Sequence, residues 1–335
     1  MQHKDTKNIR RLVLVSILLA VVVVTLGAYT RLTHAGLGCP DWPGCYGFFD
    51  VPETSEQIST AEQAFPERPV EPEKAWNEMI HRYFAGALGL FILAIAMLSI
   101  KNRGQGTPVF LPLLILCVVI FQAALGMWTV TLMLMPVVVM GHLLGGFTTL
   151  CLLFLLYLRL NPYRVPGGDA SVRKYARFGL LGIVILTAQI ALGGWTSSNY
   201  AALVCVELPI CQAGWQDELT FEKSFHPIPP EKDSYEFGHL HHAERVTIHV
   251  MHRIGAIITT IYLLWLAFTI FVKSHTRFFK NSALGLVAIL SAQIALGVSN
   301  IWFSLPLSVA VSHNIVAACL MMMLILLTYS LKRKA

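Results

Sequence analysis

The stretch LVLVSILLAVVVVTLGAY, residues 12–29, contains no charged side chain and decides the class of fold. A helix of this length crosses the hydrocarbon core of a bilayer, which is ~30 Å thick. A secretory signal peptide is the alternative, but the run is long for the apolar part of such a signal and no Ala-x-Ala cleavage site follows it. We therefore predict that a first transmembrane helix lies here.

Seven further apolar runs follow, and they begin near Ile80, Val109, Pro136, Tyr175, Val246, Ser282 and Pro306. Apolar residues make up 55% of the 335 residues and charged residues only 13%, whereas soluble domains carry about 25% charged residues. The mean hydropathy is +0.62. The sequence thus predicts an all-α integral membrane protein with eight transmembrane helices.

Basic and acidic side chains are expected on opposite sides of the membrane. Nearly all Asp and Glu lie in two long loops, about 32–79 and 197–245, whereas the loops on the other side are basic and include Lys101, Arg103, Arg173, Lys174, Lys273 and Lys280. Because basic loops stay in the cytoplasm, we expect both termini to be cytoplasmic. The net charge of +6 then reflects topology, so membrane lipid is an expected partner and nucleic acid is not.

The second half of the chain repeats the first. One constant shift along the chain matches His81-Arg82 with His252-Arg253, Gln122-x-Ala-Leu-Gly126 with Gln293-x-Ala-Leu-Gly297, and His142 with His313. A slightly shorter shift matches Leu26-Gly27 with Leu192-Gly193, and the motif Cys-x-(Asp/Glu)-x-Pro-x-Cys at 39–45 with its second copy at 205–211. Self-similarity at a fixed offset indicates two homologous structural units.

Each unit is predicted to be a four-helix bundle. The first covers residues 1–165 with the outer loop 31–79, and the second covers residues 166–335 with the outer loop 196–245. An even number of spans gives both bundles the same direction, so we expect a pseudo-twofold axis along the membrane normal.

Two histidines in each half, His81 and His142, then His252 and His313, are expected at similar depth near the outer side of the membrane. A lone intramembrane histidine is commonly a packing residue, but polar side chains at membrane depth are costly and need partners. Two imidazoles on facing helices suit a six-coordinate haem iron. We therefore predict iron ligation by all four histidines. A buried copper pair remains an alternative, whereas a structural zinc ion prefers four ligands around one site.

Arg82 and Arg253 follow the first histidine of each half and are candidates for contacts with haem propionates or with lipid headgroups. His34 and the loop histidines are given no role. The outer-loop cysteines, Cys39 with Cys45 and Cys205 with Cys211, are expected to form one short disulfide in each loop. A redox-active pair is the alternative for each loop.

Glu78 lies three residues before His81 and on the same helical face. Its counterpart in the second half is His249, which is the clearest break in the repeat. A carboxylate beside one site and not the other favours chemistry at the first site. The alternative is an acid at a helix N-terminus that interacts with the helix dipole.

Several motifs together resemble the haem A synthases of the cytochrome oxidase assembly pathway. They are Thr30-Arg-Leu-Thr33, Gly36-Leu-Gly-Cys-Pro-Asp-Trp-Pro43, Glu78-x-x-His-Arg82, His142, Met251-His-Arg-Ile-Gly-Ala256 and Ser312-His-Asn314. The similarity covers the chain apart from the variable parts of the outer loops, about 50–75 and 213–245. His34 departs from the small residue common in the family.

The resemblance implies an oxidoreductase of the bacterial cytoplasmic membrane that oxidises a pyrrole methyl group of haem O to the formyl group of haem A. It implies that His81 and His142 hold the substrate haem, that His252 and His313 hold a haem b for electron transfer, and that Glu78 lies near the reacting edge. The cysteine pairs match those of a bacterial subgroup. Haem O synthase, an electron donor and a second copy of the chain are implied partners.

Two routes to oxidation fit a bis-histidine iron, which leaves no position for dioxygen. Electrons can be withdrawn at the haem periphery while water attacks beside Glu78, or one histidine ligand can detach transiently. Two other functions use the same histidines, a dihaem electron carrier linked to quinol and a transporter of haem or a small molecule. Only the synthase would produce haem A.

Overall fold

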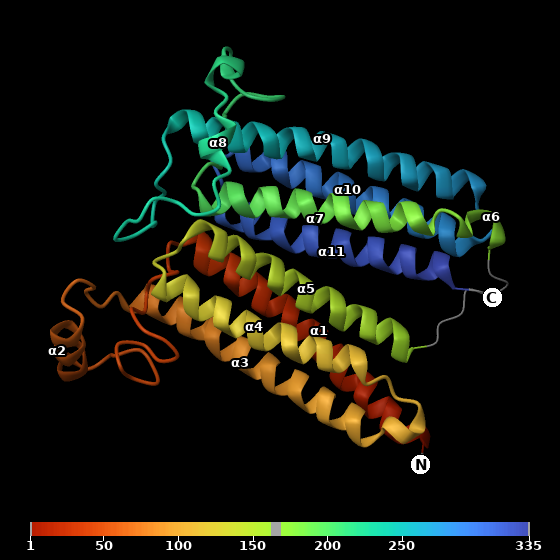
Figure 1. Ribbon diagram of the computed structural model, residues 1–335, viewed down its shortest axis with the longest axis horizontal. Coiled ribbons are helices and arrows are strands. Elements are labelled where there is room, and N and C mark those ends of the chain that lie inside the picture. The colour runs from red at the N-terminus through yellow and green to blue at the C-terminus, as the bar shows by residue number, and fades with distance from the viewer. Residues whose placement is uncertain (1, 162–168, 334–335) are drawn as a thin grey trace. The chain divides into compact units, whose positions relative to one another are not determined.

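The structure, a computed structural model, describes residues 2–161 and 169–333, and helices dominate them (Figure 1). The boundary expected between residues 165 and 166 lies outside this described part. Eight helices are long and apolar enough to cross a membrane. They are α1 (Gln2–Leu32), α3 (Pro72–Lys101), α4 (Phe110–Thr131), α5 (Pro136–Leu160), α7 (Ala176–Ser198), α9 (His242–Lys273), α10 (Arg277–Trp302) and α11 (Leu307–Lys332). The prediction of an all-α protein with eight candidate spans is confirmed.

Between these spans the described residues form three short α-helices, α2 (Ser55–Ala64), α6 (Ala170–Arg173) and α8 (Phe221–Ser224), and two short 3-10 helices, η1 (Arg103–Gln105) and η2 (Trp215–Glu218). Long helices suit a membrane because each satisfies its backbone hydrogen bonds internally. Their ends carry local signals. Pro72 opens α3, where its missing N–H costs nothing, and α9 begins with a capping box formed by His241 and Glu244.

The chain divides into two compact units. The first contains the residues up to Leu156 together with Pro227–His239, and the second contains Tyr157–His226 together with the residues from Leu240 onward. The stretch Pro227–His239, here named the crossing segment, comes from the second outer loop but belongs to the first unit.

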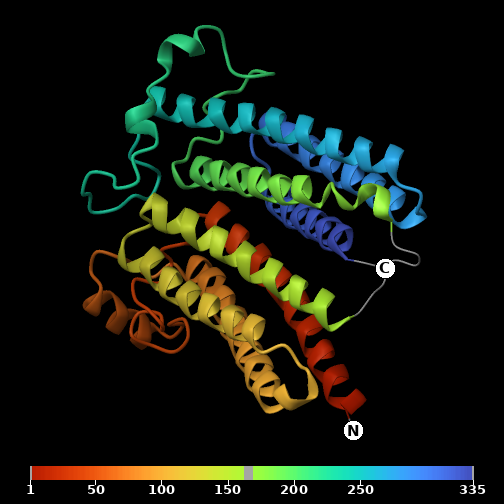
Figure 2. The same cartoon turned by 45° about the vertical axis from the view of Figure 1, so that its right-hand side comes forward.

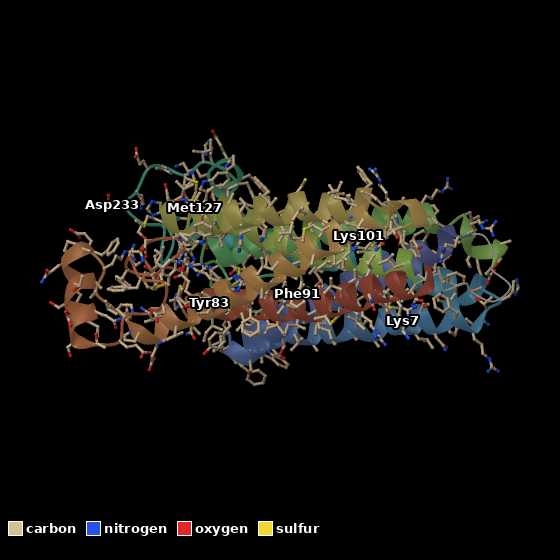
Figure 3. All side chains as sticks on the ribbon, turned by 90° about the horizontal axis from the view of Figure 1, so that it is seen from below. Lys7, Tyr83, Phe91, Lys101, Met127 and Asp233 are labelled. Carbon is tan, nitrogen blue, oxygen red and sulfur yellow. A yellow bond between two sulfur atoms is a disulfide. The ribbon has the colours of Figure 1, made fainter. Side chains whose placement is uncertain are left out.

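The first unit is a bundle of α1, α3, α4 and α5; the long α1–α3 loop with α2 lies at one end, and the α3–α4 connection lies at the other (Figures 1 and 2). Helix α3 packs against both α1 and α4. Lys7 and Lys101 lie at the opposite end from Asp233 of the crossing segment, with Phe91 between them (Figure 3). The basic and acidic ends of this unit are therefore separated by the length of its helices.

The second unit is a closed ring of four long helices. Helix α9 packs against α7 and α10, and α11 packs against α7 and α10. At the end where α9 finishes, Asp169 accepts hydrogen bonds from Ser274 Oγ at 2.7 Å and from the His275 N–H at 2.8 Å. This carboxylate fastens the start of the unit to the α9–α10 turn.

The repeat extends to backbone conformation. His34 and Tyr200, at equivalent positions of the two halves, both have φ of +53° directly after the first helix of their half. In both places the N–H of the following residue donates to a carbonyl oxygen in the last turn of the helix. Ala35 donates to Thr30 O and Ala201 to Thr196 O, each at 2.9 Å. His34 thus has a conformational role that Tyr200 shares. Two successive left-handed residues recur likewise at equivalent positions, Met133 and Leu134, then Ser304 and Leu305.

The crossing segment is fastened to the outer end of the first unit by a buried tyrosine. The Tyr235 N–H donates to Met133 O at 3.0 Å, and Tyr235 is only 4% exposed. Glu236 pairs with Arg68 at 3.6 Å. The ring of Phe237 lies 5.3 Å from that of His34. A part of the second outer loop therefore covers the loops of the first half.

Candidate functional site

Each of the four predicted histidines lies against a glycine of the preceding long helix. A Cβ atom on the glycine would lie 3.0 Å from the imidazole Cε1 of His81, 3.2 Å from that of His142, 3.1 Å from that of His252 and 3.2 Å from that of His313. The glycines are Gly27, Gly126, Gly193 and Gly297. Any side chain here would force the imidazole to move, so these glycines set how closely each ring approaches its neighbouring helix.

The structure brings His81 and His142 together inside the first unit. Their ring centroids are 6.4 Å apart and the ring planes make an angle of 77°. His252 and His313 of the second unit lie on α9 and α11, which both pack against α7 and α10. All four residues lie a few turns inside their helices, on α3, α5, α9 and α11.

Both outer-loop cysteine pairs are disulfides within their own loop. Cys39 bonds Cys45 and Cys205 bonds Cys211, with Cα–Cα distances of 4.8 Å in both. The first bridge is fully buried and packs with Tyr46 and Met79 in a small apolar cluster. The disulfide loop is therefore part of the packed first unit, directly above the helix that carries His81.

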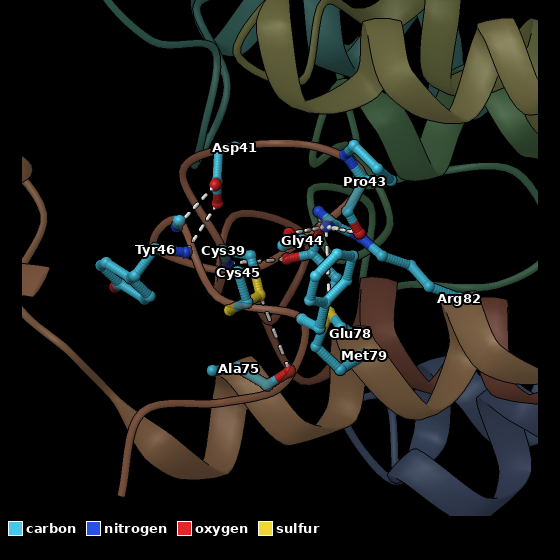
Figure 4. The surroundings of a disulfide bond; sticks show 12 residues. Cys39, Asp41, Pro43, Gly44, Cys45, Tyr46, Ala75, Glu78, Met79 and Arg82 are labelled. Atoms are coloured by element: carbon cyan, nitrogen blue, oxygen red, sulfur yellow. Dashed lines mark hydrogen bonds and ion pairs between the residues drawn. A yellow bond between two sulfur atoms is a disulfide. The ribbon is translucent and has the colours of Figure 1, made fainter. Parts of the chain in front are cut away.

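Glu78 joins this loop to α3 (Figure 4). Its carboxylate is buried and accepts a hydrogen bond from the Cys39 N–H at 3.0 Å, and it forms an ion pair with Arg82 at 2.6 Å. The alternative of a helix-end charge is wrong, because α3 begins at Pro72 and Glu73 occupies its first turn. The carboxylate instead lies within the helix, one turn from His81.

Arg82 completes the connection. Its Nη1 donates to the carbonyl oxygens of Pro43, at 3.2 Å, and of Gly44. One guanidinium thus binds both the carboxylate of Glu78 and the backbone of the disulfide loop (Figure 4). A haem propionate at Arg82 would have to share these donors.

The second unit repeats this arrangement with a different partner. Arg253 donates from Nη1 and Nη2 to the carbonyl oxygens of Glu207 at 2.5 Å, Ile210 at 2.7 Å and Cys205 at 2.5 Å. Its Nε donates to Nε2 of His249 at 3.0 Å. His249 therefore replaces Glu78 as the side chain that orients the arginine, but it brings no negative charge.

Two titratable groups near the first site lie outside the spans. Burial raises the pKa of Tyr46 to about 12, and its hydroxyl donates to Pro69 O at 2.9 Å. Burial, followed by the nearby charge of Arg31, lowers the pKa of His34. Tyr46 is thus a neutral donor and His34 a mainly neutral ring at ordinary pH.

Sequence reasoning identified the histidines, the cysteine pairs and Glu78, but it assigned no role to the Leu-Gly pairs of the repeat. It did not connect Arg82 or Arg253 to the disulfide loops. The Leu-Gly signal was visible, since the same dipeptide precedes all four histidines in chain order. The crossing segment left no signal of this kind, because its partners lie in distant parts of the sequence.

Comparison with known proteins agrees with this organisation. A family model described as cytochrome oxidase assembly protein matches residues 10–325. A heme A synthase of Shewanella oneidensis is 50% identical over 321 residues, which cover 96% of each chain. Heme A synthases of Neorickettsia sennetsu and Rickettsia prowazekii are 26% and 24% identical, over 92% and 95% of this chain and 94% and 96% of theirs. The resemblance found in the sequence motifs is confirmed, and this chain belongs to the cytochrome oxidase assembly protein family.

Proposed function

We propose that this protein is a haem A synthase, a membrane oxidoreductase that converts haem O to haem A. The observation that carries the proposal is the facing pair His81 and His142 beside a buried carboxylate, in a chain that is 50% identical to a heme A synthase over nearly its whole length. Haem O is the substrate and haem A the product.

The histidine pair fits an iron between its rings. A metal–imidazole nitrogen bond is about 2 Å long, and each ring nitrogen lies a little over an ångström from the ring centre. Two imidazoles on opposite sides of one iron then have centroids about 6 Å apart, which agrees with the 6.4 Å between His81 and His142.

The hydrogen bonds of the imidazoles support the same assignment. His81, His142 and His313 each bond a backbone carbonyl of the preceding helix, that of Val23, Gln122 and Gln293 respectively. The Nδ1 atoms of these three rings are buried and have no hydrogen-bond partner in the part of the chain that the structure describes. A buried ring nitrogen without a hydrogen-bond partner is available to bind a metal, and a backbone carbonyl beside a ligating imidazole orients it.

A haem suits two such ligands because the porphyrin supplies the remaining four nitrogens. Within residues 2–161 and 169–333, no group of three or more His, Cys, Asp or Glu side chains could hold a metal ion by itself. We assign the substrate haem to His81 and His142, and a haem b that supplies electron transfer to His252 and His313.

Glu78 supports the assignment of the substrate to the first half. Its buried carboxyl group lies one turn from His81, and the second half has His249, which has no carboxyl group, at that position. Its carboxylate fixes the disulfide loop beside the site, and it can accept a proton from water at the reacting edge. Arg82 and Arg253 remain candidates for contacts with haem propionates. Such contacts would use the guanidinium N–H groups that do not bond the loop carbonyl oxygens.

The topology is part of the proposal. The charge distribution supports cytoplasmic termini, haem sites toward the outer face of a bacterial cytoplasmic membrane, and halves 1–165 and 166–335 related by a pseudo-twofold axis along its normal. A haem O synthase as supplier, an electron donor and a second copy of the chain are proposed partners.

Chromatography of haems extracted from cells that co-express this chain and a source of haem O tests the activity. Haem A should appear with the wild-type chain and be absent with His142→Ala. A chain that binds haem but yields no haem A would overturn the proposal and favour the dihaem electron carrier. Accumulation of unmodified haem outside the membrane would favour the transporter.

A further inference from the structure

The glycine that faces each histidine ends a five-residue motif, and this motif occurs four times. The copies are Val23-Val-Thr-Leu-Gly27, Gln122-Ala-Ala-Leu-Gly126, Gln189-Ile-Ala-Leu-Gly193 and Gln293-Ile-Ala-Leu-Gly297. Three copies begin with glutamine, and the copy that faces His81 begins with valine. All four copies share the Leu-Gly pair, and at the first position only the copy that faces His81 lacks glutamine.

Each glutamine reaches the histidine that its helix faces. Gln189 Nε2 lies 3.1 Å from Nδ1 of His252 and donates to the His252 carbonyl at 3.0 Å. Gln293 Nε2 lies 3.2 Å from Nε2 of His313. Gln122 Nε2 donates to the carbonyl of His142 at 2.5 Å.

The amide oxygen Oε1 of each glutamine has no hydrogen-bond donor among the described residues. The Oε1 atoms of Gln122, Gln189 and Gln293 are buried, and no described residue hydrogen-bonds to them. A half-turn of the amide would let Oε1 accept from an imidazole N–H, but in Gln122 and Gln189 it would also give up the bond from Nε2 to the histidine carbonyl. The contacts that the structure shows all run from Nε2: Gln122 and Gln189 bond the backbone of the histidine they face, and Gln189 and Gln293 lie against its ring.

Glycines on the histidine helices make room for two of these amides. A Cβ at Gly145 would lie 2.0 Å from Gln122 Oε1, and a Cβ at Gly255 would lie 2.3 Å from Gln189 Oε1. Both glycines come three residues after the histidine. At this place after His81 the chain has Phe84. After His313 this place is Val316 although Gln293 is present, so the position that faces His81 differs from the other three in lacking the amide.

We infer that the three glutamines are positioning residues for the histidines they face, and that His81, which faces Val23, is the iron ligand that a small exogenous molecule can displace. A side chain that bonds a ligating imidazole fixes its orientation and typically changes metal affinity by about 10- to 100-fold. His81 has only the backbone carbonyl of Val23 for this purpose. The inference rests on the proposed haem ligation and places the exchangeable coordination position in the substrate half, on the side of α3.

Carbon monoxide binding to the dithionite-reduced, purified holoprotein tests this inference through visible spectra. Wild-type protein should bind carbon monoxide at one of its two haems. Val23→Gln, which restores the motif of the other three copies, should weaken this binding about tenfold or more. Gln189→Val, the converse exchange, should allow the second haem to bind carbon monoxide as well. Because the two variants shift the bound fraction in opposite directions, the result does not depend on separating the spectra of the two haems.

Matched controls separate the amide from its volume. Val23→Leu enlarges the side chain without an amide and should bind carbon monoxide like the wild type. Gln189→Met removes the amide at similar volume and should behave like Gln189→Val. Unchanged binding in Val23→Gln, or the same weakening in Val23→Leu, would overturn the inference. If Val23→Gln purifies without haem, the Gln189 variants decide the question. If neither of them gains carbon monoxide binding, the inference is overturned.

The proposed ligands have their own test. His81→Ala and His142→Ala should each change the low-spin haem spectrum of the holoprotein. If neither did, the ligand assignment itself would fail, whatever the carbon monoxide results.

Discussion

Glu78→Gln tests whether the buried carboxylate holds the disulfide loop beside the first site. In the structure one carboxylate oxygen accepts from the Cys39 N–H and the other from Arg82. An amide has one acceptor and one NH2 group. Whichever way the introduced amide turned, its NH2 would face a donor, so one of these two bonds would be lost.

The expected cost follows from burial and charge. The side chains of Glu78 and Arg82 are 7% and 12% exposed, so solvent screens their ion pair only weakly. Hydrogen bonds to charged groups contribute about 1.5–3 kcal/mol. Opening of the loop should therefore become about 10- to 150-fold more favourable.

Reduction of the disulfides by a membrane-impermeant phosphine, followed by alkylation and mass spectrometry, measures this opening. Cys39 and Cys45 should be alkylated faster in Glu78→Gln by a factor in that range. Cys205 and Cys211, which Arg253 fastens independently, provide the control within the same molecule. Glu73→Gln, an exposed acid on the same helix, is the matched variant.

Haem analysis of the same preparations separates positioning from assembly. Because His81 and His142 remain, haem content should stay near that of the wild type, whereas haem A formation should fall sharply. Equal alkylation rates together with undiminished haem A would refute the reasoning and leave Glu78 without either role.

Two further predictions concern packing. Gly193→Ala should lower haem b content in purified protein, because the added methyl would lie 3.1 Å from Cε1 of His252. Gly89→Ala is the control, because a methyl group there meets no neighbour within 4 Å. Equal haem b content in both variants would contradict the contact. Tyr235→Ala should make limited proteolysis of the crossing segment faster, because Tyr235 is only 4% exposed and its packing would be lost. Glu236→Gln should have little effect on cleavage, since its partly exposed ion pair at 3.6 Å contributes about 0–1 kcal/mol. Faster cleavage in the second variant than in the first would contradict this ranking.

Much of the fold was predictable because a membrane imposes simple rules on sequence. Apolar runs long enough to span a bilayer identified eight helices, and the internal repeat divided the four histidines into one pair for each half, His81 with His142 and His252 with His313. The short Cys-x-x-x-x-x-Cys spacing predicted bridges within each loop, and the structure contains both. These features depend on hydrophobicity, periodicity and short separations, which are local properties of a chain.

The sequence by itself therefore determined the helices, the two halves and the candidate ligands. Only the tertiary structure decided how these ligands are held. The contacts of His81 with Gly27, of Arg82 with the Gly44 carbonyl and of Tyr235 with Met133 join residues that are far apart in the sequence. Such contacts depend on which helix faces and loops meet when the bundle packs, and no local pattern encodes that choice. The reason is that burial fixes a side chain only after its neighbours from distant parts of the chain are in place.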